Sequence, residues 1–157
     1  MELEHKKEII TNFNYWKESI RFRDKLLSLW SSFDRFNRDI KKLYNLSKVT
    51  DLYNKKEYKK VFSELNKDDF FNFIKNRKRG DGWNGWVYNI KEGKVYEWNN
   101  IENIKEFWEI IRTIVNNTDH WEKILDTEIN EKLLEQASII FESFLENLYI
   151  EFWILNN

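Results

Sequence analysis

The sequence predicts a mainly α-helical bundle with one inserted β-hairpin at about residues 86–98. Apolar residues recur every three or four positions along most of the chain, which is the period of an amphipathic helix. The chain has no proline and its four glycines all fall between positions 80 and 93. Turn-forming residues are therefore confined to one central window. We expect a single domain over residues 1–157, with helices on both sides of an insertion at about residues 75–100.

The composition indicates a folded, soluble protein of the cytoplasm. Hydrophobic residues make up 41% of the chain and aromatic residues 17%, which is enough to form a core although 34% of residues are charged. The absence of cysteine excludes disulfides and thiolate metal sites, and two distant histidines do not suggest a metal site, so no cofactor is expected. No apolar run reaches the roughly 18 residues of a membrane span, and the N-terminus lacks the apolar core of a signal peptide.

Charge is distributed unevenly along the chain. Residues 1–79 contain 20 Lys and Arg against 12 Asp and Glu, whereas residues 80–157 contain 6 against 15. This asymmetry is typical of a chain whose first half faces an anionic partner such as RNA. It equally fits two halves that attract each other, within a monomer or across a dimer, and both interpretations stay open.

Four helices are predicted in the first half, at Glu2–Asn14, Trp16–Tyr44, Lys55–Leu65 and Asp68–Asn76. Along the second of these, apolar residues alternate at spacings of three and four: Leu26, Leu29, Trp30, Phe33, Phe36, Ile40 and Leu43. Its other face is basic: Arg21, Arg23, Lys25, Arg35, Arg38, Lys41 and Lys42. Most basic helix faces are merely solvated, so this face gives limited support for an anionic partner.

A compact basic run leads into the glycine-bearing centre. Its cationic members are candidate nucleic-acid contacts: Lys75, Arg77, Lys78 and Arg79. Such a run is more often an exposed loop, which is the interpretation we favour.

The centre itself predicts a hairpin between Trp86–Ile90 and Lys94–Trp98. The three-residue loop between them ends in Gly93, where the left-handed conformation falls. The expected register pairs aromatic residues on one face, Trp86 with Trp98 and Tyr88 with Tyr96. An aromatic platform can stack bases, but its commoner role is packing on a helix, because an isolated hairpin is marginal in water.

A helix that begins near Ile101 carries the main chemical motif. Its apolar residues, together with the polar cluster at 116–119, predict that the helix ends before Asp119. Asp119 would then cap the next helical segment, with Glu122 completing a capping box. Arg112 lies at the edge of the apolar stripe, and His120 follows the amides of Asn116 and Asn117. An arginine, amides and a histidine in this order form a candidate phosphate site.

The last helix is predicted from about Glu128 to Leu155, with Thr127 as its cap. Its apolar residues cover so wide an arc that it must be buried on more than one side. A small bundle does not obviously supply that burial, so we expect a homodimer that uses this helix, the Ile101–Val115 helix, or both.

Two segments together resemble the HEPN superfamily. Residues 26–44, LLSLWSSFDRFNRDIKKLY, resemble its first long helix, and residues 107–149 resemble its motif helix, following loop and last helix. The resemblance implies an all-α bundle that often dimerises, and in many members a metal-independent ribonuclease. In such members an arginine holds the scissile phosphate and a histidine transfers a proton. Guanidinium grips phosphate bidentately and imidazole titrates near neutral pH, so the division suits the chemistry.

The resemblance makes Arg112 and His120 the catalytic candidates, with Asn116, Asn117 and Asp119 as supporting phosphate contacts. The family places four to six residues between its arginine and histidine, whereas this chain has seven. Amides and a carboxylate stand where the family histidine would fall. Without a catalytic role, Arg112 would pair with a neighbouring carboxylate on its helix, and His120 would be an ordinary surface residue.

Three functions therefore remain open at this stage. The first is a HEPN ribonuclease, for example a toxin with an antitoxin partner or a phage-defence effector. The second is an inactive HEPN-like module that binds RNA or nucleotides or regulates another protein. The third is a small protein-binding inhibitor or immunity-type protein.

Overall fold

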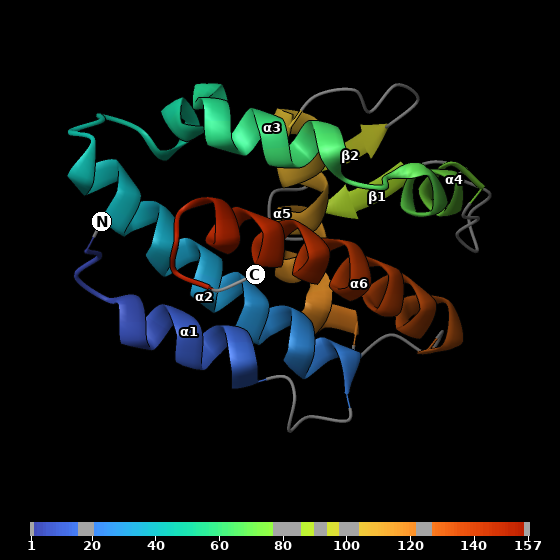
Figure 1. The fold of residues 1–157 in the computed structure, drawn as a ribbon. Coiled ribbons are helices and arrows are strands. Elements are labelled where there is room, and N and C mark those ends of the chain that lie inside the picture. Colours follow the sequence, from blue (N-terminus) through green and yellow to red (C-terminus); the bar gives the residue numbers. More distant parts are fainter. Residues whose placement is uncertain are drawn as a thin grey trace. The chain divides into compact units, whose positions relative to one another are not determined.

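The computed structural model describes residues 2–15, 21–76, 86–89, 94–97, 104–121 and 127–155, and it is mainly α-helical (Figure 1). The chain divides into two compact units. The first takes residues from 1–65 and 141–157, and the second takes residues from 66–140. Among the described helices, none combines the length and apolarity that a transmembrane segment needs.

The first unit is helical throughout its described elements. These are α1 (Lys6–Tyr15), α2 (Phe22–Leu43), the short 3-10 helix η2 (Val49–Asn54), α3 (Lys56–Glu64) and the last part of α6 (Thr127–Glu151). The long helix begins later than the predicted Trp16, because Arg21 has extended backbone angles (φ −109, ψ 128). The predicted helix α3 is present with nearly the expected bounds, and η2 lies in the segment before it, where no helix was predicted.

Aromatic rings fill the core of the first unit. On α2, Phe33 and Phe36 recur at the predicted helical spacing and are almost completely buried. The Phe36 ring centroid lies 4.9 Å from that of Tyr149 and 5.3 Å from that of Phe152. Phe33 makes an edge contact with Phe141 at 5.4 Å. Such ring pairs contribute stability beyond the burial of apolar area, so they stabilise the packing of α2 against the end of α6.

Three buried hydroxyls connect the helices of the same unit. The Ser32 hydroxyl donates to the carbonyl oxygen of Ile9 at 2.7 Å and shares a 2.8 Å hydrogen bond with the Tyr149 hydroxyl. The Tyr58 hydroxyl donates to the Asn37 side-chain oxygen at 2.7 Å. Because each partner is buried, these bonds satisfy polar groups that would otherwise be left without water.

Two helices of the first unit end in the same backbone motif. After α2, Leu46 N–H donates to Lys41 O at 2.9 Å and Asn45 has φ 53. After α6, Ile154 N–H donates to Tyr149 O at 2.9 Å and Trp153 has φ 62. This is the Schellman ending, which usually places glycine at the left-handed position. It ends α6 at Glu151, earlier than the predicted Leu155.

The second unit contains α4 (Asp68–Asn76), β1 (Trp86–Asn89), β2 (Lys94–Glu97), α5 (Ile104–Trp121) and the first part of α6. The two strands pair antiparallel and β1 contacts α5.

The predicted strand register is wrong by one residue. Trp86 pairs with Glu97 and Tyr88 with Val95, so neither aromatic pair forms as expected. The last pair joins Asn89 to Lys94, which leaves four residues between the strands instead of three. A shift of one residue moves every side chain of a strand to the opposite face, which is why the aromatic pairing pattern failed. The predicted loop at 91–93, including Gly93, lies outside the described residues, as do Ile90 and Trp98.

Helix α5 does not end at the polar cluster. It runs without interruption from Ile104 to Trp121, so Asp119 is a helical residue and not the predicted N-cap. Asparagine, threonine and aspartate each cost at most about 0.7 kcal/mol in a helix, and no glycine or proline lies in the segment to stop it. Thr127 likewise is the first residue of α6 and not the residue before it. Glu122 lies outside the described residues.

The wide apolar arc of α6 is buried within one chain. From Leu133 to Tyr149 the buried apolar and aromatic residues are Leu133, Leu134, Ala137, Ile140, Phe141, Phe144, Leu145, Leu148 and Tyr149. Ile139 is 51% exposed, and Trp153, just after the helix, is 85% exposed. The arc therefore does not need a second copy to cover it, and the homodimer stays a prediction without that basis.

Candidate functional site

The exposed side of α5 carries the predicted phosphate site. Arg112 is exposed and Asn116, one turn later, is partly exposed, whereas Ile114 between them is buried. Residues four apart on a helix lie on the same side, so the guanidinium and the amide occupy one polar strip. Lys105 is also exposed, two turns before Arg112 on that side.

For the other predicted site residues on α5, the structure describes the backbone but not the side chains. Because α5 is continuous, His120 is eight residues after Arg112, about 12 Å further along the axis. Asn117 and Asp119 are in the same helix, and the side chains of these three residues lie outside the described part of the structure. The predicted helix end before Asp119 is therefore wrong, and no break in the α5 backbone lies between Arg112 and His120.

Thr113, the residue after Arg112, has a structural role. It is 1% exposed, and its hydroxyl donates to Glu109 O at 2.6 Å within the helix. A buried hydroxyl that donates its proton to its own backbone has no O–H left to donate to a phosphate oxygen. Thr113 therefore does not contribute to a phosphate site.

The basic run before the centre is mostly outside the described residues. Lys75 is in α4, but its side chain is not described, and Arg77, Lys78 and Arg79 fall outside the described part of the chain. Their assignment as nucleic-acid contacts stays a prediction.

Acidic residues neutralise much of the basic face of α2. Among the pairs given for the described residues, four involve its cations: Lys25–Glu142 at 2.6 Å, Arg35–Glu8 at 3.6 Å, Arg38–Asp34 at 3.0 Å and Lys42–Glu4 at 2.9 Å. The first of these joins the basic first half of the chain to the acidic second half, and the other three lie within the first half. The observation favours pairing of these cations inside the chain over an open anion-binding face on α2.

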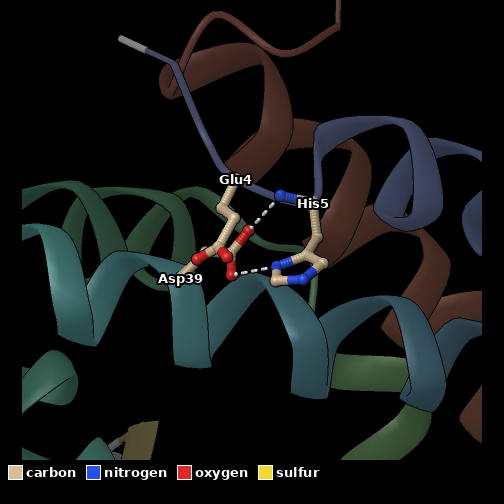
Figure 2. Close-up of side chains that lie close together, drawn as sticks. All are labelled: Glu4, His5 and Asp39. Carbon is tan, nitrogen blue, oxygen red and sulfur yellow. Dashed lines mark hydrogen bonds and ion pairs between the residues drawn. The ribbon is translucent and has the colours of Figure 1, made fainter.

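A second polar cluster, which the sequence did not predict, lies at the start of α1 (Figure 2). The carboxylate of Asp39, on α2, accepts two bonds from His5. The His5 backbone N–H donates to Oδ2 at 2.8 Å, and the His5 ring Nδ1 lies 2.8 Å from Oδ1. The Asp39 side chain is 4% exposed and that of His5 32% exposed. A buried carboxylate needs such partners, because burial without them is costly.

Glu4 completes this cluster at its exposed edge. Its carboxylate accepts a hydrogen bond from the Lys42 ammonium at 2.9 Å. That hydrogen bond, followed by the attraction between the two charges, lowers the pKa of Glu4 and raises that of Lys42. Beside the cluster, α1 and the residues before it line a shallow open groove: Glu4, His5, Lys7, Glu8, Thr11 and Asn12.

Sequence reasoning missed this cluster because its members are far apart in the chain. Asp39 is 34 residues from His5 and is surrounded by basic residues, so it reads as one acid on a solvated face. The available signal was its position three residues after Phe36 and beside Ile40, at the edge of the apolar stripe. An acidic residue there is drawn toward the core and needs a partner.

No protein-family model, curated protein or solved structure matches this chain. The chemistry of the two clusters is therefore the guide to function. The strip on α5 offers a guanidinium and an amide, which bind phosphate oxygens, and the cluster at α1 offers a carboxylate-bound imidazole.

Proposed function

We propose that this chain is a HEPN-like helical domain that binds RNA through its phosphate backbone, with Arg112 as the central contact. The observation that supports this proposal is the exposed position of Arg112 on a helix whose apolar residues from Ile104 to Ile114 are buried, one turn from the partly exposed Asn116. A guanidinium presents five donors in a planar fork and grips phosphate bidentately. The amide of Asn116 can donate to the same phosphate group.

RNA binding should depend on the shape of the Arg112 side chain and not only on its charge. We expect Arg112→Ala to weaken binding of a single-stranded RNA about tenfold, which corresponds to about 1.4 kcal/mol. The slope of log K against log salt should decrease by about one counterion, because one phosphate contact is lost. Fluorescence anisotropy at several salt concentrations measures both quantities.

Two variants control for charge alone. Arg112→Lys keeps the charge but loses the bidentate geometry, so it should recover only part of the affinity. Lys105→Ala removes one exposed charge from the same side of the same helix and should weaken binding less than Arg112→Ala. Equal losses for Lys105→Ala and Arg112→Ala would contradict a specific phosphate contact at Arg112.

Metal-independent RNA cleavage is the second candidate, and it requires two copies of the chain. The HEPN resemblance implies that two copies of the motif meet across a dimer, and within α5 the backbones of Arg112 and His120 are separated by about 12 Å of helix rise. Catalysis would therefore join Arg112 of one copy to His120 of another in a homodimer. A toxin or phage-defence effector would use this activity, and growth arrest on expression would be its cellular sign.

Complementation between inactive variants tests the two-copy site. If the site is shared, Arg112→Ala and His120→Ala should each abolish cleavage, and their mixture should recover part of it in the presence of a chelator. Light scattering should then give a dimeric mass at tens of micromolar. A monomer that binds RNA without cutting it would reject the ribonuclease and retain the binding function.

A further inference from the structure

Two elements bring three metal-ligating side chains together at the start of α1 (Figure 2). Glu4 and His5 are consecutive in the segment that leads into α1, and Asp39 comes from α2. One ligand atom from each of the three lies within 4.8 Å of the other two. One imidazole nitrogen and two carboxylate oxygens form a donor set that suits zinc and other divalent first-row metals.

The inner two atoms of this cluster lie close to the spacing of metal ligands. Zinc binds histidine nitrogen and carboxylate oxygen at roughly 2.0–2.2 Å in tetrahedral sites, so two of its ligand atoms are about 3.4 Å apart. His5 Nδ1 and Asp39 Oδ1, now hydrogen-bonded at 2.8 Å, would separate by about 0.6 Å to hold an ion between them. Rotation of the exposed Glu4 side chain would bring its carboxylate to the same ion.

The Asp39 carboxylate is held in place independently of the His5 ring. Its second oxygen, Oδ2, accepts the His5 backbone N–H at 2.8 Å, and its side chain is almost completely buried. A hydrogen bond of this kind orients a ligating carboxylate and leaves the other oxygen for a cation.

A cation already lies at the exposed edge of the cluster. The Lys42 ammonium is 2.9 Å from Glu4 Oε2, and it also interacts electrostatically with Asp39. The two carboxylates therefore attract positive charge at this point of the surface. A metal ion would compete with the Lys42 ammonium for the Glu4 carboxylate. Replacing Lys42 therefore tests whether an ion binds there.

We propose that Glu4, His5 and Asp39 bind one divalent transition-metal ion of the zinc class. On binding, the proton on His5 Nδ1 is exchanged through solvent for one on Nε2, the Nδ1 lone pair coordinates the ion, and Lys42 moves away from Glu4. The ion joins the segment before α1 to α2. This site is separate from the strip on α5 and does not depend on RNA binding.

Calorimetric titration with Zn²⁺ alone tests the site on the full chain. We expect one ion per chain, and at least tenfold weaker binding in His5→Gln, which removes the imidazole. His120→Gln removes the other histidine of the chain and should leave the affinity unchanged. Mg²⁺ should bind far more weakly, because it prefers an octahedral set of oxygens and waters.

Two further comparisons separate this site from adventitious binding. Lys42→Met should tighten Zn²⁺ binding several-fold, since the competing ammonium is gone. Glu4→Gln should weaken binding, whereas Glu8→Gln, which changes a neighbouring carboxylate outside the set, should not.

Several outcomes would overturn the proposal. These are absence of Zn²⁺ binding up to millimolar concentration, equal affinity in wild type and His5→Gln, and loss of binding in His120→Gln. Asp39→Asn should also lose the site, but this buried position can affect folding. Circular dichroism of Asp39→Asn therefore accompanies the titration, and His5→Gln decides the matter if that variant does not fold.

Discussion

Ser32 shows how a single polar residue can connect three helices of the first unit. It is fully buried, and its hydroxyl joins Ile9 on α1 to Tyr149 on α6. The apolar stripe of α2 could be predicted from sequence, and Phe33, Phe36 and Ile40 are buried as expected. The role of the serine could not be predicted, because its partners are 23 and 117 residues away and leave no local pattern.

Removing the Ser32 hydroxyl should cost more than one ordinary hydrogen bond. We expect Ser32→Ala to lower the free energy of unfolding by about 1–3 kcal/mol, because the buried Tyr149 hydroxyl and Ile9 carbonyl lose a partner. Tyr149→Phe in the Ser32→Ala background should then cost much less than Tyr149→Phe in the wild type. Urea unfolding of the two single variants and the double variant measures this coupling, and additive losses would contradict the shared bond.

The same contrast applies to the predicted site residues. The position of Arg112 at the edge of an apolar stripe could be predicted from the sequence, and Arg112 is exposed in the structure. The His5–Asp39 contact could not be predicted from the sequence, because it forms only when the segment before α1 lies against α2. Long-range polar contacts of this kind depend on the tertiary fold, whereas apolar periodicity is local.

At the scale of elements, helices were easier to predict than their ends. The interior of α5 follows the apolar spacing, yet the helix continues through Asn116–Asp119, where polar residues suggested a stop. The propensity cost of those residues is small, and packing of the neighbouring apolar residues outweighs it. The predicted strand register was wrong because one residue of loop length decides the register. The sequence allows a loop of three or of four residues.

Helix ends without glycine give a matched pair of stability tests. A non-glycine residue in the left-handed region costs roughly 1–2 kcal/mol, but asparagine tolerates it better than bulky residues. Trp153→Gly should therefore stabilise the protein by about 0.5–1 kcal/mol after the entropy cost of glycine, since the side chain is 85% exposed and loses little packing. Asn45→Gly should change stability by a few tenths of a kcal/mol.

Thermal and urea unfolding of both variants measure this difference. A Trp153→Gly variant that is less stable than wild type would mean that the indole makes contacts that offset the strain. The buried neighbour Ile154 should be left unchanged in both experiments, because its apolar contact accompanies the Schellman ending.

At the scale of the whole molecule, stability should decrease in alkaline solution. Burial raises the pKa of Tyr58 and of Tyr149 well above the ordinary tyrosine value, and hydrogen bonds to Glu151 and Glu4 raise the pKa of Lys60 and Lys42. The folded state thus holds these protons more tightly than the unfolded state. Their contribution is complete below about pH 10 and is lost as the pH rises above that value toward the folded pKa values.

Replacing one buried phenol should make this loss less steep. Above about pH 10, Tyr149→Phe should reduce the slope of unfolding free energy against pH by up to about 1.4 kcal/mol per unit. Tyr15→Phe, at a tyrosine that is 59% exposed, is the matched control and should retain the wild-type slope. Urea unfolding at several values between about pH 9 and 11.5 gives the slopes. Equal slopes for Tyr149→Phe and wild type would contradict the prediction.

The charge asymmetry of the chain could be read from the sequence, but the partners of its basic residues could not be predicted. The pair between Lys25 and Glu142 joins the basic and acidic halves, and other cations of α2 meet carboxylates on α1 or on α2 itself. Net charge by segment cannot distinguish a partner outside the chain from one inside it. Only the fold brings the opposite charges within reach of each other.

The left-handed Trp153 also gives the molecule a natural optical reporter. Its indole is 85% exposed to water, whereas that of Trp108 on α5 is 6% exposed. A dissolved collisional quencher such as iodide should therefore reach the emission of Trp153 much more readily than that of Trp108. The difference between the fluorescence of the wild type and that of Trp153→Phe would give the emission of Trp153. A change in the quenching of that emission would report binding of a partner at the end of α6.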